Sequence, residues 1–154
     1  MSLHPGAAKV FRLKDVALAP IICYEDTDPT LSRAAARLGA QAIVLITNDS
    51  WFSRSIESVQ HAAQAVLRAI ETGLPVIRVG NSGVTGVIAA DGRARWLTDG
   101  DGRPLVDAAG AMVETVPLAA KPAQTLYVRL GDWPLILLFL AALPLAVLPR
   151  KEIA

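Results

Sequence analysis

Two apolar runs, each followed by a helix-like segment, restrict this chain to a small set of folds. The first run extends from Val16 to Cys23 and the second from Ala42 to Thr47, and both are rich in branched side chains. Continuous runs of this length are typical of strands that are buried on both faces of a sheet. Strand followed by helix, twice in succession, predicts an α/β fold in which crossover helices join parallel strands.

Helix signals follow both runs. Asp28-Pro29 provides a capping carboxylate and a proline suited to the first turn, and Gly39 provides a left-handed end. A second helix is predicted over 56–72, because apolar residues recur there at spacings of three and four. We expect its buried face to carry Ile56, Val59, Ala63, Val66, Leu67 and Ile70, and its solvent face Glu57, His61, Gln64, Arg68 and Glu71.

After Pro75 the predicted elements are short strands. Strands are predicted over 76–79 and 84–89 on either side of a tight turn, and Asp91-Gly92 predicts a hairpin into 93–98. A last strand is predicted over 111–118. The whole of 11–130 is therefore expected to form one domain.

The two ends of the chain differ in composition. Residues 1–10 contain Ser, Pro and Gly without a long apolar stretch, so we expect a flexible lead-in and not a signal peptide. Residues 133–148 carry no charge and precede Arg150-Lys151. We expect a transmembrane helix and a cytoplasmic tail over 131–154, although a full span needs about 20 apolar residues. A buried core helix and an interfacial anchor are the alternatives.

Charge and cysteine content exclude several classes of function. The net charge is +1 without a long run of Lys or Arg, which gives a nucleic-acid partner no electrostatic support. A single cysteine excludes an internal disulfide framework and a cysteine-rich zinc site. Since the sequence also lacks a ligand pattern for a metal or nucleotide, we expect no cofactor.

Cys23 is the first candidate for chemistry. It ends a predicted strand just before a turn that starts a helix, where backbone N–H groups and the helix dipole can lower the pKa of a thiol and stabilise an oxyanion. The alternative is a small buried hydrophobic residue. His61 could form a Cys–His pair with it, but a hydrogen bond from His61 to Glu57, one helical turn earlier, is the favoured interpretation.

Polar and aromatic residues end the second predicted strand. In a parallel sheet, Asn48 and Asp49 would lie at the same edge as Cys23, where ligands bind in such folds. Trp51 and Phe52 follow directly. They would form either an apolar rim suited to an acyl chain or a hydrophobic plug under a loop.

Several ordered motifs together resemble one family. The motifs are Ile-Cys-Tyr-Glu at 22–25, Asn-Asp-Ser-Trp-Phe at 48–52, Gln-His at 60–61, Arg-Ala-Ile-Glu at 68–71, Asn-Ser-Gly-Val-Thr at 81–85 and Gly-Asp-Trp-Pro at 131–134. In this order and spacing they are similar to the C-terminal half of the apolipoprotein N-acyltransferases. Those enzymes are the membrane-bound branch of the carbon–nitrogen hydrolase (nitrilase) superfamily.

This resemblance implies an α-β-β-α sandwich and a Glu–Lys–Cys triad at the bacterial inner membrane, with the hydrolase-like domain on the periplasmic side. Cys23 would take an acyl group from a phospholipid as a thioester and pass it to the N-terminal amine of a lipoprotein. The residues that would support this site are Tyr24, Glu25, Asn48, Trp51 and Phe52.

Departures from the family pattern limit what the resemblance implies. The family's Glu and Lys lie well upstream of the cysteine, whereas the 22 residues before Cys23 contain Lys9, Lys14 and no glutamate, and neither lysine matches. Ser53 stands where the family has glycine. We therefore expect a C-terminal portion that is inactive alone unless a missing N-terminal portion or a partner chain completes it. The alternatives are a nitrilase-like amidase acting on small C–N bonds and a non-catalytic, membrane-tethered remnant.

Overall fold

The computed structural model describes residues 8–52, 55–118 and 125–147 of the chain. Its elements, in chain order, are β1 (Phe11–Leu13), β2 (Val16–Ile22), the 3-10 helix η2 (Cys23–Thr27), α1 (Pro29–Arg37), β3 (Ala42–Asn48), the 3-10 helix η3 (Ser50–Phe52), α2 (Glu57–Thr72), β4 (Val76–Asn81), β5 (Gly86–Ile88), β6 (Ala94–Trp96), α3 (Leu126–Leu130) and α4 (Trp133–Val147).

The strands form one six-stranded sheet in the order β1-β2-β3-β4-β5-β6. β2, β3 and β4 are parallel, and the remaining pairs are antiparallel. The predicted α/β class is therefore confirmed. β1 was not predicted. It is short, contains Arg12, and joins β2 through a turn in which Lys14 has a φ of 53°.

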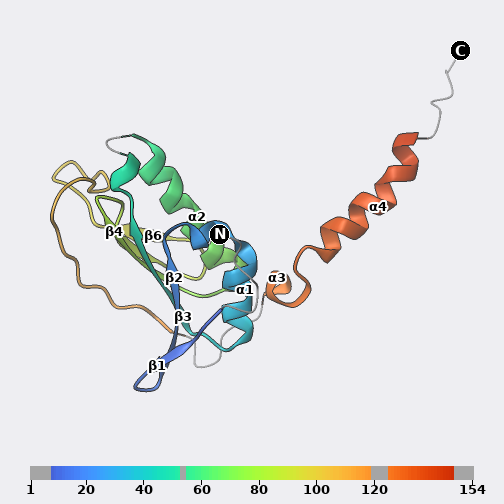
Figure 1. The fold of residues 1–154 in the computed structure, drawn as a ribbon, viewed down its shortest axis with the longest axis horizontal. Coiled ribbons are helices and arrows are strands. Elements are labelled where there is room, and N and C mark those ends of the chain that lie inside the picture. The colour runs from blue at the N-terminus through green and yellow to red at the C-terminus, as the bar shows by residue number, and fades with distance from the viewer. Residues whose placement is uncertain (1–7, 53–54, 119–124, 148–154) are drawn as a thin grey trace, which may run out of the picture.

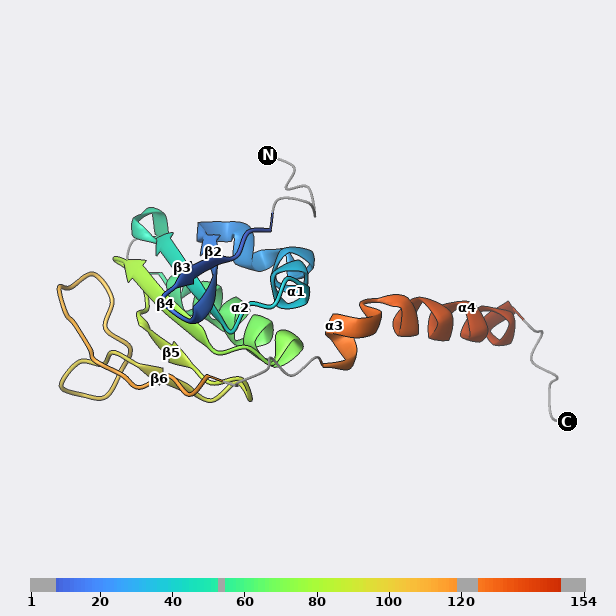
Figure 2. The ribbon, with the colours of Figure 1, turned by 90° about the horizontal axis from the view of Figure 1, so that it is seen from below.

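Helices α1 and α2 cover one face of the sheet (Figures 1 and 2). Sheet residues such as Ile21, Leu45 and Val76 are buried beneath them. The helices contribute mainly alanines to this core, among them Ala35 and Ala65. Small side chains allow the helix axes to approach the sheet closely. The alanine-rich helices can therefore bury one face of the strands.

The opposite face of the parallel strands is open. Ile22, Ile46 and Val79 are neighbours in the register of β2, β3 and β4, and they are 54%, 52% and 47% exposed. The prediction that the runs forming β2 and β3 are buried on both faces was therefore wrong for the described part of the chain. Their buried and exposed side chains alternate because α1 and α2 pack on one face only.

The buried face of α2 also differs from the prediction. Val59, Leu67 and Ile70 are about half exposed, whereas His61 and Arg68 are each only 5% exposed. The helix turns its alanines and these two basic residues towards the sheet and η2. His61 and Arg68 face inward because both hydrogen-bond to Asp26 of η2, a contact that the spacing of apolar residues does not indicate.

The predicted strand over 111–118 is absent, and that segment is irregular. Arg95 of β6 holds it through an ion pair with Glu114 at 2.9 Å and a hydrogen bond to the carbonyl of Thr115 at 3.4 Å. Most of the predicted flexible lead-in falls on residues outside the described part, while Val10 packs against the core.

Two arginines of α1 attach the C-terminal helices to the domain. Arg33 and Arg37 donate hydrogen bonds of 2.8–3.4 Å to the carbonyl groups of residues 127–129 at the end of α3. From there α4 projects away from the sheet (Figures 1 and 2). Its aliphatic side chains are exposed from Leu135 to Leu143.

The predicted transmembrane helix over 131–154 is not supported. Within the described residues, no helix combines the length and the apolar character needed to cross a membrane. α4 comprises 15 residues, or about 22 Å at 1.5 Å per residue. The rest of the predicted span lies outside the described part of the chain.

Candidate active site

Cys23 is the first residue of η2, directly after the last residue of β2. Its φ is +53° and its side chain is partly exposed. A left-handed conformation costs a residue other than glycine about 1–2 kcal/mol. Such a conformation persists only where the surrounding structure enforces it, and it is common at functional sites.

Local hydrogen bonds shape this turn. The backbone N–H of Ile22 donates to Oε2 of Glu25 at 2.9 Å, and the Thr27 hydroxyl donates to the carbonyl of Tyr24 at 2.7 Å. Asp28 then caps α1, because its Oδ1 accepts from the N–H of Thr30 at 2.8 Å. Glu25 is therefore a capping residue of the Cys23 turn, and its carboxylate is engaged there.

The parallel register brings the ends of three strands to the same edge as Cys23. The Asn81 side chain at the end of β4 donates to Oδ1 of Asn48 at 2.9 Å, and the N–H of Asp49 donates to the carbonyl of Asn81, also at 2.9 Å. The expectation that Asn48 and Asp49 share an edge with Cys23 is confirmed by this geometry.

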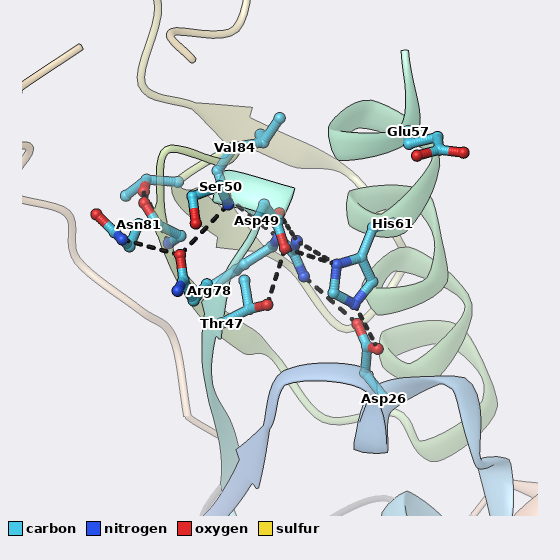
Figure 3. A network of polar contacts seen from close by, with 12 residues as sticks. Asp26, Thr47, Asp49, Ser50, Glu57, His61, Arg78, Asn81 and Val84 are labelled. Carbon is cyan, nitrogen blue, oxygen red and sulfur yellow. Dashed lines mark hydrogen bonds and ion pairs between the residues drawn. The ribbon is translucent and has the colours of Figure 1, made fainter. Parts of the chain in front are cut away.

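A buried ionic cluster lies beneath this edge (Figure 3). Its four members, Asp26, Asp49, His61 and Arg78, are at most 5% exposed. The His61 ring lies between the two carboxylates, with Nε2 2.9 Å from Asp26 Oδ1 and Nδ1 2.9 Å from Asp49 Oδ1. Arg78 reaches the same carboxylates, at 2.8 Å from Asp49 Oδ2 and 3.4 Å from Asp26 Oδ2.

The protonation of His61 follows from these contacts. Burial lowers the pKa of His61, but the hydrogen bonds to Asp26 and Asp49 and the negative charge of Asp26 outweigh burial and leave the pKa raised. Ionised carboxylates only accept hydrogen bonds, so this geometry favours a proton on both ring nitrogens. With His61 protonated, the cluster contains two negative and two positive charges.

Further bonds connect the cluster to the surrounding elements. Arg78 Nε donates to the carbonyl of Val84 at 3.2 Å, and the Thr47 hydroxyl donates to Asp49 Oδ1 at 2.9 Å. Arg68 Nη1 donates to the backbone carbonyl of Asp26 at 2.9 Å. Residues from η2, β3, α2, β4 and the β4–β5 turn are thus linked through one buried group of charges.

Aromatic rings cover the outer side of the cluster. Tyr24 stacks on the His61 ring with 4.7 Å between centroids, and Phe52 meets both rings edge-on at 6.0 and 6.2 Å. Trp51 is 81% exposed. Phe52 therefore packs as a plug over His61, while Trp51 projects into solvent. Burial, followed by the charges of Glu57 and Cys23, raises the pKa of Tyr24 and keeps its phenol neutral.

The expectation that His61 lies on the solvent face of α2 with Glu57 as its partner was wrong. Asp26 and Asp49 occupy its two ring nitrogens, which also excludes the Cys–His pair that the sequence had left as the less favoured alternative. Asp26 and Arg78 were not among the predicted site residues. One signal was present: an arginine in the middle of an apolar strand needs a buried partner.

No group of three His, Cys, Asp or Glu side chains in the described ranges is arranged to hold a metal ion. Beside the Cys23 turn, a largely apolar groove is lined by residues that include Pro20, Ile22, Leu31 and Ala35, together with the charged Lys9 and Glu25. The edge thus combines a partly exposed cysteine with a nearby apolar surface.

Comparison with known proteins gives consistent results. The family model described as carbon-nitrogen hydrolase matches residues 2–126. Among curated proteins, the apolipoprotein N-acyltransferase of Allorhizobium ampelinum is 36% identical over 139 residues, which are 90% of this chain and 24% of that protein. The apolipoprotein N-acyltransferase of Shewanella oneidensis is 33% identical over 135 residues, or 88% and 24% of the two chains. The chain thus spans about a quarter of these relatives.

Solved structures agree with the fold. A variant of an amidase from Nesterenkonia sp. AN1, with the acetamide moiety of fluoroacetamide added at its active-site cysteine, has a TM-score of 0.54 at 19% identity. The alignment covers 86% of this chain and 47% of that one. Another structure of a Nesterenkonia amidase has a TM-score of 0.52, also at 19% identity, over 86% of this chain and 47% of that one.

Proposed function

Because this chain belongs to the carbon–nitrogen hydrolase family, we propose that Cys23 is the nucleophile of an acyl transfer. The observation that carries this proposal is the conformation of Cys23. Its side chain is partly exposed at the end of a strand, and its φ is +53°. Buried ion pairs hold the turn that contains it. The adduct on the cysteine of the similar amidase supports the same role for the only cysteine of this chain.

The similarity to apolipoprotein N-acyltransferases supports a specific donor and acceptor. The Cys23 thiolate attacks an ester carbonyl of a phospholipid, a C–S bond forms, the ester C–O bond breaks, and the lysophospholipid leaves with a proton. The N-terminal amine of a lipoprotein then attacks the thioester. A C–N bond forms, the C–S bond breaks, the amine loses a proton, and the thiolate is restored.

The proton acceptor for the thiol comes from outside the Cys23 turn in this proposal. Among the described residues, two candidates are engaged elsewhere, His61 by Asp26 and Asp49 and Glu25 by the N–H of Ile22. We therefore propose that a further segment or a partner chain supplies a general base and a cation at this edge. Such a group would lower the pKa of the thiol and activate it.

The open face of the sheet supports a second layer. Ile22, Ile46 and Val79 form an apolar row across β2, β3 and β4. A second sheet packed on this row would complete an α-β-β-α sandwich and reach the edge that carries Cys23. Exposed apolar residues on α4 support contact with lipid. We propose that α4 contacts the bacterial inner membrane and that the domain lies on its periplasmic side.

A thioester-trapping experiment tests the role of Cys23. The purified chain is incubated with an activated palmitoyl ester, and the acyl adduct is measured by mass spectrometry before and after hydroxylamine treatment. We expect a hydroxylamine-sensitive adduct on the folded chain that is absent in Cys23→Ala. An adduct that persists in Cys23→Ala would overturn the proposal, and a folded chain without any adduct at Cys23 would favour a non-catalytic remnant.

A second set of substrates distinguishes acyl transfer from amide hydrolysis. Vesicles of phospholipid with a labelled acyl chain test the proposed donor, in membranes where a partner is available. A small amide such as butyramide tests the alternative. Hydrolysis of the amide that is lost in Cys23→Ala, without labelling from phospholipid, would replace the acyltransferase proposal with an amidase.

A further inference from the structure

We infer that His61, in its doubly protonated form, is a positioning residue that fixes the Cys23 turn against the end of β3. The inference deepens the proposed function, since it assigns a role toward Cys23 to a side chain that does not touch the thiol. The geometry that carries it is the bridge from His61 to one carboxylate of η2 and one carboxylate that follows β3.

The bridge joins two segments that no sheet hydrogen bond connects at this point. Asp26 belongs to η2, three residues after Cys23, and Asp49 follows the last residue of β3. Each accepts from one nitrogen of the His61 ring at 2.9 Å. Loss of either ring proton would set a nitrogen lone pair against a buried carboxylate oxygen, so the bridge requires the imidazolium.

The charges around His61 favour this form. Asp26 faces the ring from η2, Asp49 from the end of β3 and Arg78 from β4. Glu57 lies one turn earlier on α2, and Figure 3 shows no contact between it and the ring. With His61 neutral, the buried group would hold two carboxylates against a single guanidinium. An uncompensated buried charge is costly, which stabilises the proton on His61.

Arg78 does not replace the proton on His61. Its Nη2 lies 3.3 Å from His61 Nδ1 but only 2.8 Å from Asp49 Oδ2. The shorter contact is an ion pair, so Arg78 donates mainly to Asp49. Nδ1 of His61 therefore pairs with the other oxygen of the Asp49 carboxylate, Oδ1.

The bridge acts on two residues of the turn that follow Cys23. Asp26 is anchored by His61 and, through its backbone carbonyl, by Arg68 at 2.9 Å. Tyr24, the neighbour of Cys23, stacks on the His61 ring with an interplanar angle of 15°. A cationic ring binds an aromatic face more strongly than a neutral one does. Deprotonation of His61 would therefore weaken both of these contacts and release the left-handed conformation of Cys23.

Nuclear magnetic resonance tests the protonation state directly. The chain has two histidines, so His4→Gln leaves one imidazole signal to assign. We expect both His61 nitrogens to carry protons at pH 7 and to titrate above the ordinary value of about 6.5. A neutral tautomer at pH 7 would overturn the inference. This measurement uses the otherwise intact chain and needs no enzymatic activity.

Amide hydrogen exchange tests the positioning role. In His4→Gln, protection of the amides of residues 23–28, corrected for intrinsic exchange, should fall at least tenfold as the pH rises through the His61 midpoint. Amides of β5 should change less than threefold. In His61→Gln, protection of the turn should be low and without this pH step.

A step that persists in His61→Gln, or turn protection that is flat with pH in His4→Gln, would show that His61 does not hold the turn. If His61→Gln fails to fold, the pH step in His4→Gln decides the question alone. If Cys23 accepts no acyl group but the step is found, the proposed function fails and the positioning role remains.

Discussion

The carboxylate of Asp49 packs directly against Gly83 in the turn between β4 and β5. A Cβ atom on Gly83 would lie 2.7 Å from Asp49 Cγ, and one on Gly80 would lie 2.8 Å from the carbonyl carbon of Gly83. Nonbonded carbon atoms do not approach so closely in proteins. Gly80 and Gly83 therefore allow the turn to close over the buried charges. This gives a physical reason for a glycine at each end of the Gly-Asn-Ser-Gly sequence at 80–83.

Gly83→Ala should destabilise the protein by displacing Asp49 from Arg78 and His61. Overpacking of a closed site costs about 1–3 kcal/mol in the free energy of unfolding. The matched control is Gly100→Ala, because a Cβ on Gly100 meets no atom within 4 Å. Urea denaturation followed by circular dichroism measures both variants. Equal stability of the two would show that Asp49 is not held against Gly83.

Arg78→Met should have a larger effect. Arg78 is completely buried and is the second cation for Asp26 and Asp49. Removing one partner from a buried ionic group typically costs about 3–5 kcal/mol, because an uncompensated charge stays behind. We expect Arg78→Lys, which keeps the charge but not the forked geometry, to lie between Arg78→Met and the wild type in urea denaturation.

The control for Arg78 is an exposed ion pair. Arg93 pairs with Asp91 at 2.8 Å, and its side chain is 87% exposed. Exposed pairs contribute little because solvent screens them. Arg93→Met should therefore leave the urea midpoint almost unchanged. If Arg78→Met were as harmless as Arg93→Met, the buried cluster would not depend on its arginine.

The raised pKa of His61 predicts how stability depends on pH. Between the unfolded value of about 6.5 and the higher folded value, the folded chain holds a proton that the unfolded chain has lost. The stabilisation is complete below about pH 6.5 and is lost as the pH rises through the folded pKa. Urea denaturation from pH 5.5 to 9, in a Cys23→Ala background that removes the thiol titration, measures this loss.

The same series on a His61→Gln variant provides the comparison. The difference in unfolding free energy between the two proteins should shrink with rising pH. A difference that is constant, or that grows with pH, would contradict a protonated His61 in the folded state.

Local signals in the sequence predicted much of the fold correctly. Asp28 caps α1 as expected, and Gly39, which follows that helix, has a φ of +86°. The strand–helix repeat gave the parallel order of β2, β3 and β4, and this order placed Cys23 and Asn48 at one edge. These features depend on residues that are neighbours in sequence, or on the handedness of crossovers, so a single sequence carries them.

Features set by distant partners could not be predicted. Arg78 and Asp26 are 52 positions apart, and nothing local indicates that they meet. The orientation of α2 was misjudged for the same reason, because ion pairs with remote segments turned His61 inward. The segment 111–118 resembles a strand in composition, but it is irregular, and the Arg95 side chain donates to its Thr115 carbonyl.

The left-handed conformation of Cys23 leads to a test that is independent of chemistry. At a residue with a φ of +53°, glycine avoids a strain of about 1–2 kcal/mol but loses more entropy on folding. We therefore expect Cys23→Gly to be as stable as Cys23→Ala or more stable by up to about 1 kcal/mol. At exposed Ala63 in α2, the change from alanine to glycine should instead cost about 1 kcal/mol. Urea denaturation measures all of these variants. If Cys23→Gly were less stable than Cys23→Ala by the same amount as at Ala63, Cys23 would have ordinary backbone angles. A strained backbone would then no longer support a catalytic role for its thiol.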